Sequence, residues 1–213
     1  MPWRQPKWAT PPQGQAGIAA ALLIVLASGC AAAFRVSRLE GSSPWPPAEA
    51  TEKSVVVAFR GVLERDGRDF ALSFQAANLY RAVTLWVYDT SGLCYPLRHG
   101  AGEYGEVRAD VRLRQRSQES ALWLALNNLT FGLIPYWETH TWTLTTEFRT
   151  WEGKELGTFE KSQKMRTFAH LVLLPFYPFA PPPGVACGII RDLNRATLNE
   201  ARSKGILGNP GSR

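Results

Sequence analysis

The chain has 213 residues and a formal net charge of +6, from 24 Lys+Arg against 18 Asp+Glu. Hydrophobic residues make up 45% of it and charged residues 20%, a composition that excludes a wholly disordered polymer. No apolar run reaches the roughly 18–20 residues of a membrane-spanning helix, which excludes a polytopic membrane protein. The basic residues are scattered along the chain, so the sequence predicts no nucleic-acid partner.

The N-terminal segment has the order of a secretory signal. Arg4 and Lys7 precede an uncharged apolar run over residues 16–26, which is too short for a transmembrane helix. Small residues and a cysteine follow, in the order Leu26-Ala27-Ser28-Gly29-Cys30. This stretch resembles the lipobox of bacterial lipoproteins, in which the cysteine becomes an acylated N-terminus after cleavage.

The resemblance implies a signal peptide over residues 1–29 and fatty acyl chains, such as palmitate, on Cys30. A stable anchor needs more than one chain, because each buried CH₂ contributes only about 0.8 kcal/mol. Ala31 is not the aspartate that typically retains such proteins in the inner membrane. The resemblance therefore implies a lipid anchor in the outer membrane, with the domain on its periplasmic face.

Residues 30–53 read as the lipidated cysteine and a tether, because they are rich in Pro, Gly and Ser and carry no apolar periodicity. Such a tether would hold the domain away from the membrane, with Trp45 able to return to the headgroups. We expect a single domain over residues 54–205 and a flexible tail over residues 206–213.

The first elements of the domain are a buried strand and an ambiguous segment. Residues 55–59 are β-branched and apolar, which predicts a strand, and Asp66-Gly67 is a turn signal. Residues 68–91 fit an alternating strand at their start and a helical face further on. Because Gly and Pro are absent from this stretch, the sequence favours a helix with Asp69 as its N-cap.

Strict alternation of apolar and charged residues over 106–116 predicts a strand with one buried and one solvated face. Its arginine row is read as a solvated sheet face, with an anion-binding surface as the alternative. Alternation around the turn signal Glu152-Gly153 predicts a β-hairpin over residues 141–161. A final helix follows the prolines at 181–183 and ends at Gly205.

This order of elements predicts an α+β fold. We expect a small sheet that contains the hairpin and is covered by the C-terminal helix and by one earlier helix.

Two apolar segments, residues 121–137 and 168–179, flank the predicted hairpin. Because its first strand begins where its second strand ends, both segments should emerge side by side, opposite the turn. They are read as core, as a membrane or partner patch, or as walls of a lipid pocket. The candidate patch residues are aromatic: Trp123, Phe131, Tyr136, Trp137, Phe176, Tyr177 and Phe179.

The motif Leu129-Thr130-Phe131-Gly132-Leu133-Ile134-Pro135, with the Trp-rich hairpin behind it, resembles sequences in uncharacterised bacterial envelope lipoproteins. That resemblance brings no defined activity with it.

Two cysteines remain once Cys30 is assigned to lipidation. In an oxidising compartment Cys94 and Cys187 are candidates for a disulfide, and two unpaired thiols are the favoured alternative.

The chain has no recognisable catalytic pattern. His99, His140 and His170 are widely spaced, without metal-ligand neighbours, and there is no nucleophile elbow, Walker loop or dinucleotide fingerprint. We therefore expect no catalytic residue, no metal and no cofactor.

The sequence thus predicts a non-catalytic envelope lipoprotein that binds another envelope component, with an envelope protein as the expected partner. The alternative is a lipid carrier or sensor whose pocket is lined by residues 121–137 and 168–179. A weaker third hypothesis is a hydrolase built from dispersed polar groups.

Overall fold

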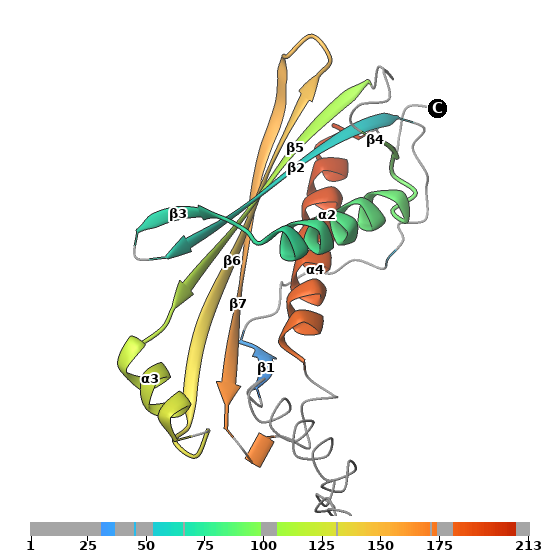
Figure 1. Ribbon diagram of the computed structural model, residues 1–213. Coiled ribbons are helices and arrows are strands. Elements are labelled where there is room, and N and C mark those ends of the chain that lie inside the picture. Colours follow the sequence, from blue (N-terminus) through green and yellow to red (C-terminus); the bar gives the residue numbers. More distant parts are fainter. Residues whose placement is uncertain are drawn as a thin grey trace, which may run out of the picture.

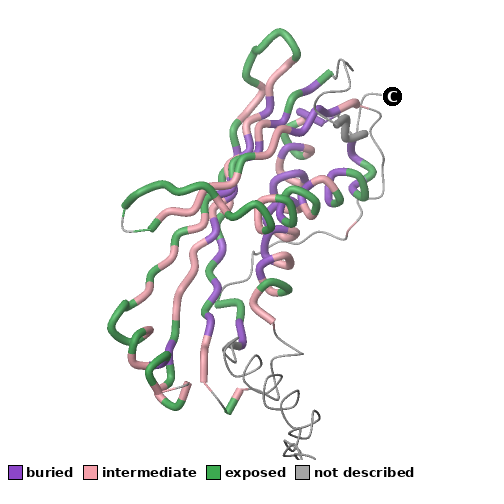
Figure 2. Tube along the Cα trace, viewed as in Figure 1, coloured by how far each residue is buried: buried purple, intermediate pink, exposed green. Residues whose placement is uncertain are grey.

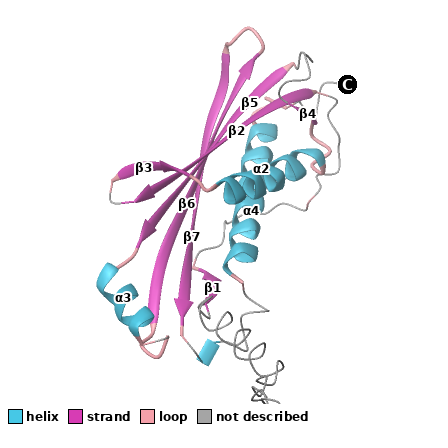
Figure 3. Cartoon of the chain, in the orientation of Figure 1, coloured by secondary structure: helices cyan, strands magenta, loops and turns pink. Residues whose placement is uncertain are grey.

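The computed structural model describes residues 31–36, 45, 53–65, 67–98, 106–130, 132–170, 172–173 and 181–207. These residues form one sheet, with helices α2 (Phe74–Asp89) and α4 (Pro182–Ser203) together on one face of it (Figure 1). A further helix, α3 (Ala121–Leu129), lies at one end of the sheet, away from the other two (Figure 3). The predicted α+β class, with a C-terminal helix and an earlier helix over the sheet, is confirmed. No helix of this part of the chain is both long and apolar enough to cross a membrane.

The sheet has seven strands in the described residues, in the order β1-β7-β6-β5-β2-β3, and β4 pairs with the start of β2 whereas β3 pairs with its end. Strand β2 runs parallel to β4 and β5, and the other pairs are antiparallel. The strand bounds are β1 Ala31–Arg35, β2 Ser54–Arg65, β3 Arg68–Ala71, β4 Tyr95–Arg98, β5 Val107–Gln118, β6 Tyr136–Thr150 and β7 Glu155–Ala169.

The alternating strand and the hairpin are confirmed. In β5 the apolar residues from Val107 to Leu113 are buried and the charged ones between them are not. The hairpin is longer than predicted, since β6 and β7 pair from their turn down to Tyr136 and Ala169. Gly153 in the turn has a φ of 90°, a left-handed conformation that favours glycine.

The core lies between the sheet and the two covering helices. Trp142 of β6 is buried and meets the ring of Tyr80 from α2 edge-on, with centroids 5.3 Å apart. From α4, Ile189 and Leu193 are fully buried against the same layer. This is the hydrophobic layer that the alternating strands require, because each strand offers only one apolar face.

The segment over residues 68–91 is not one helix, as the sequence favoured. Its start is β3, which pairs antiparallel with the end of β2. Helix α2 begins after Ser73, whose hydroxyl accepts a hydrogen bond from the Ala76 amide, so the N-cap is Ser73 and not Asp69. The alternating pattern at the start of this stretch belongs to β3, and the helical pattern further on belongs to α2, the next element along the chain.

The predicted boundaries of the domain were too narrow. Ala31–Arg35 is a strand on the edge of the sheet, where Ala32 and Ala33 are buried, and therefore not tether. Trp45 packs on the domain, and the Cζ atom of Arg195 lies over its ring, 5.0 Å from the ring centroid. At the other terminus, Ile206 and Leu207 are buried in the core and not part of a flexible tail. Short apolar stretches without periodicity gave no signal that tertiary packing would recruit them.

The hairpin is longer than the helices that cover it. Strands β6 and β7 have 15 residues each, which at about 3.4 Å per residue is roughly 50 Å. Helix α4 has 22 residues, which at 1.5 Å per residue is roughly 33 Å. The end of the hairpin that holds the start of β6 projects past α2 and α4 (Figure 1), and there α3 is largely exposed (Figure 2), as is Trp137 of β6.

Several predictions from the sequence lie outside the described residues. They are the signal peptide at 1–29, the acylation of Cys30, most of the tether, the tail from 208 onward, and the patch residues Phe131, Phe176, Tyr177 and Phe179.

Candidate functional site

The two apolar segments meet at the projecting end of the hairpin, as their positions predicted. Trp137 of β6 lies opposite Phe168 of β7, and Tyr136 lies opposite Ala169. The turn at the other end of the hairpin lies far from them (Figure 1).

Half of the described large apolar side chains of these segments are exposed, which argues against a role for the whole of both segments as core. We call this set the end surface. Its exposed fractions are Leu122 67%, Trp123 44%, Leu129 77%, Leu133 66%, Trp137 50% and Val172 67%. Monomeric proteins rarely expose large contiguous apolar patches unless these bind something.

A buried amide holds α3 against the hairpin. The Asn127 side chain is buried and donates from Nδ2 to the carbonyl oxygens of Ile134, at 2.5 Å, and Ala169, at 3.3 Å. The Thr130 hydroxyl closes the helix, because it donates to the Leu126 carbonyl and accepts from the Ile134 amide. These bonds satisfy backbone groups at the helix end and the loop, so α3 has a fixed position on the two strands.

Two residues of the end surface have stacked indole rings. The rings of Trp123 and Trp137 are 6.2 Å apart at their centroids and inclined by 27°. Tyr136, the neighbour of Trp137 on the opposite face of the strand, is buried and donates its hydroxyl to Glu119 at 3.3 Å. Burial, with the nearby Glu138 charge, raises the pKa of Tyr136 to about 12. Two of the predicted patch residues are thus exposed, and Tyr136 supports the strand beneath them.

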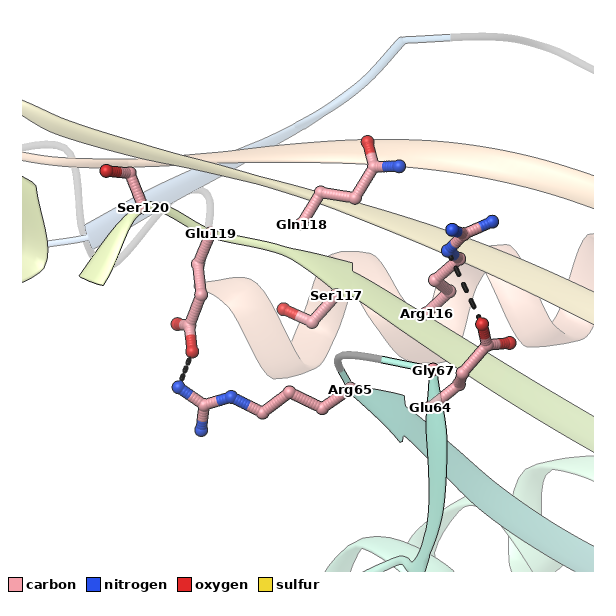
Figure 4. A pocket seen from close by; sticks show the side chains of 8 residues that line it. All are labelled: Glu64, Arg65, Gly67, Arg116, Ser117, Gln118, Glu119 and Ser120. Carbon is pink, nitrogen blue, oxygen red and sulfur yellow. Dashed lines mark ion pairs between the residues drawn. The ribbon is translucent and has the colours of Figure 1, made fainter.

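A polar cleft of about 440 Å³ lies between the end of β2 and the end of β5 (Figure 4). Arg65 pairs with Glu119, and Arg116 pairs with Glu64 at 3.5 Å, as Figure 4 shows. Each carboxylate in this cleft therefore has an arginine partner. The remaining lining residues are Gly67, Ser117, Gln118 and Ser120.

Beside the cleft, Glu138 joins a serine and a histidine. Its carboxylate accepts from the Ser117 hydroxyl and lies 3.4 Å from His140 Nε2. Burial alone would raise the pKa of Glu138, but hydrogen bonds from His140 and Ser117 outweigh burial and hold it below its ordinary value. The serine proton points to the carboxylate and not to an imidazole, so this is not the order of a nucleophilic triad.

Among the described residues, no group of three or more His, Cys, Asp or Glu side chains could hold a metal ion.

The disulfide considered from the sequence does not form. Cys94 is buried beside α2, Cys187 is half-buried on α4, and both thiols are free. Burial raises the pKa of Cys94 to about 11 and also raises that of Cys187. Both groups are therefore protonated near neutral pH and behave as small apolar side chains.

Sequence reasoning missed Asn127 and the strand at residues 31–35 as parts of this end of the molecule. An asparagine inside an apolar run was a usable signal, because a buried amide needs partners. The strand had none, since its sequence, Ala31-Ala32-Ala33-Phe34-Arg35, has no periodicity.

No protein-family model matches the chain, and no curated protein matches it. Solved structures of the PelC dodecamer from Paraburkholderia phytofirmans are similar to it. One covers 79% of this chain and 94% of its own, at 9% identity and a TM-score of 0.39. A second, of a point variant, covers 76% and 93%, at 10% identity and a TM-score of 0.37.

Proposed function

We propose that this protein is a non-catalytic lipoprotein of the bacterial cell envelope, anchored by acyl chains on Cys30, which binds another envelope component through its end surface. The outer membrane, on its periplasmic face, is the proposed location. The observation that carries the binding role is the exposure of the end surface, whose six side chains are 44–77% exposed. Such a surface lowers its free energy when a second apolar surface removes it from water.

A lipid carrier would need the same side chains to line an enclosed space. Leu122, Trp123 and Leu129 of α3 are exposed instead, and Trp137 of β6 is half exposed although it stacks on Trp123. Docking is therefore the better-supported use of these residues.

The anchor is tested on the full-length chain and a Cys30→Ala variant in a Gram-negative host. We expect mass spectrometry to find acyl chains on residue 30 of the wild type alone, and the variant to leave the membrane fraction. An unmodified Cys30 in a chain that still fractionates with membranes would contradict the lipoprotein assignment.

The binding role is tested with a photo-crosslinking residue at position 133 in living cells. Position 151 is the matched control, because Trp151 is exposed at the opposite end of the same hairpin. We expect crosslinked products from position 133 that are absent from position 151. Identical products from both positions would show that the end surface has no special role.

A further inference from the structure

We propose that the end surface docks on the lipid bilayer itself, on the leaflet that receives the acyl chains of Cys30. The inference rests on the proposed lipid anchor and names the envelope component that the end surface binds. It follows from the place of Ala31 in the sheet.

The first described residue lies at the same end of the sheet as the end surface. In β1, Ala31 pairs with Ala169, the last residue of β7, and Ala169 also pairs with Tyr136, the first residue of β6. Strand β1 then runs away from this end, toward Arg35 opposite Met165. Trp137, which is exposed, is the second residue of β6 and so lies at this same end of the sheet.

Only one peptide bond separates this point from the anchor. Consecutive Cα atoms are about 3.8 Å apart, and Ala31 directly follows Cys30 in the sequence. The sequence predicted a tether over residues 30–53, but Ala31 is already paired in β1, so the first residues of that segment belong to the sheet. Acyl chains on Cys30 would bring the bilayer surface to the end of the hairpin.

Strand β1 is held firmly enough to transmit this constraint. Ala32 and Ala33 are buried, and the Val36 amide donates to the Lys164 carbonyl at 3.0 Å. Arg35 forms an ion pair with Asp192 of α4, so the strand is tied to the covering helix as well as to β7. The position of the chain at residue 31 is therefore fixed relative to the end surface.

The side chains of the end surface suit a membrane interface. Indole rings lie at the headgroup level of bilayers because they combine a large apolar area with a polar N–H group. Here Trp123 and Trp137 are stacked, and the exposed leucines Leu129 and Leu133 lie in the same segment. Apolar side chains of this kind enter the boundary between headgroups and acyl chains.

Basic side chains border the end surface on the same face of the sheet. Side chains two residues apart along a strand share a face, so Arg166 follows Phe168 on the face of Trp137, and Lys164 follows Arg166. Both basic residues are exposed. Cations just above an apolar contact favour anionic headgroups at that depth, which a protein partner would not require.

The test is tryptophan quenching in the full-length, acylated protein, reconstituted in vesicles of phosphatidylethanolamine and phosphatidylglycerol with or without a lipid brominated on its acyl chain. We expect brominated lipid to quench the wild-type fluorescence. The Trp123→Phe/Trp137→Phe variant should lose most of this quenching. Trp151→Phe is the matched control, since Trp151 is 51% exposed against 50% for Trp137, and it should keep the quenching.

Equal fluorescence with and without bromine would overturn bilayer docking, as would the same loss of quenching in the Trp151→Phe variant. Position 133 crosslinking to a protein, with no quenching, would assign the end surface to a protein partner instead. In each sample, mass spectrometry shows independently whether residue 30 carries acyl chains. A failure of docking on an acylated chain is thereby distinguished from a failure of the anchor, which would overturn both proposals.

Discussion

The helix-covered part of the hairpin and its projecting end both contain tryptophan, but the side chain is buried in the first and exposed in the second. Trp142 in the middle of β6 is 1% exposed beneath α2, whereas Trp137 at its start is 50% exposed. The two residues are on the same strand, but Trp142 faces the helices and Trp137 faces away from them. Apolar content alone therefore does not define a core, because a second layer must also cover it.

The largest effect on stability is expected when Trp142 and Trp137 are each replaced by alanine. Trp142→Ala should lower the free energy of unfolding by about 3–5 kcal/mol, since it leaves a cavity in a buried layer. Trp137→Ala should cost only about 1 kcal/mol, chiefly its stacking on Trp123. Urea unfolding followed by far-UV circular dichroism measures both, and similar costs would mean that the end surface is covered in solution.

A smaller effect is expected at the amide that fastens α3. Asn127→Ala should cost about 1–3 kcal/mol, because the carbonyl oxygens of Ile134 and Ala169 lose their donor. Amide hydrogen exchange should rise over residues 121–137 and not in α4. Asn128→Ala is the control, since Asn128 is exposed on the same helix. Equal exchange in the two variants would remove the assigned role of Asn127.

The ion pair between Arg35 of β1 and Asp192 of α4 should contribute about 1 kcal/mol or less to the free energy of unfolding, as other partly exposed ion pairs do. Gly188 leaves room for Arg35, whose Cζ lies 3.3 Å from where a Cβ would stand. Gly188→Ala should therefore displace the guanidinium from Asp192 and speed amide exchange in residues 32–36. In Gly184→Ala a Cβ would meet Pro181 and not Arg35, so exchange in β1 should stay unchanged.

The smallest effect concerns the acid stability contributed by Glu138, beside the polar cleft. The pKa of Glu138 lies below its ordinary value of 4.5, so its ionised form stabilises the fold above that pH. This contribution is lost as the pH falls through the folded-state pKa. Glu138→Gln should therefore flatten the loss of thermal stability below about pH 4.5. Glu152→Gln in the exposed turn is the charge-matched control, and an unchanged slope in Glu138→Gln would contradict the interpretation.

Alternation made the sheet predictable in its long strands. In β5 the period of two was strict, so Val111 and Leu113 could be assigned to the core without knowing what covers them. The face of α4 was readable as well, because Ile189 and Leu193 recur at helical spacing. At residues 68–91, two short elements overlapped in one window, and neither period was long enough to decide between them.

The sequence by itself determined the α+β class, the hairpin, the final helix and the meeting of the two apolar segments at one end. These follow from local periodicity and from the antiparallel geometry of a hairpin, which need no knowledge of distant residues. Tertiary structure alone decided that the end surface is exposed, that Cys94 and Cys187 stay apart as free thiols, and that Ala31–Arg35 joins the sheet. The first depends on which face of the strands the helices cover, the second on where α4 packs relative to residue 94, and the third on which edge of the sheet is open for pairing. No local pattern in the chain records any of the three.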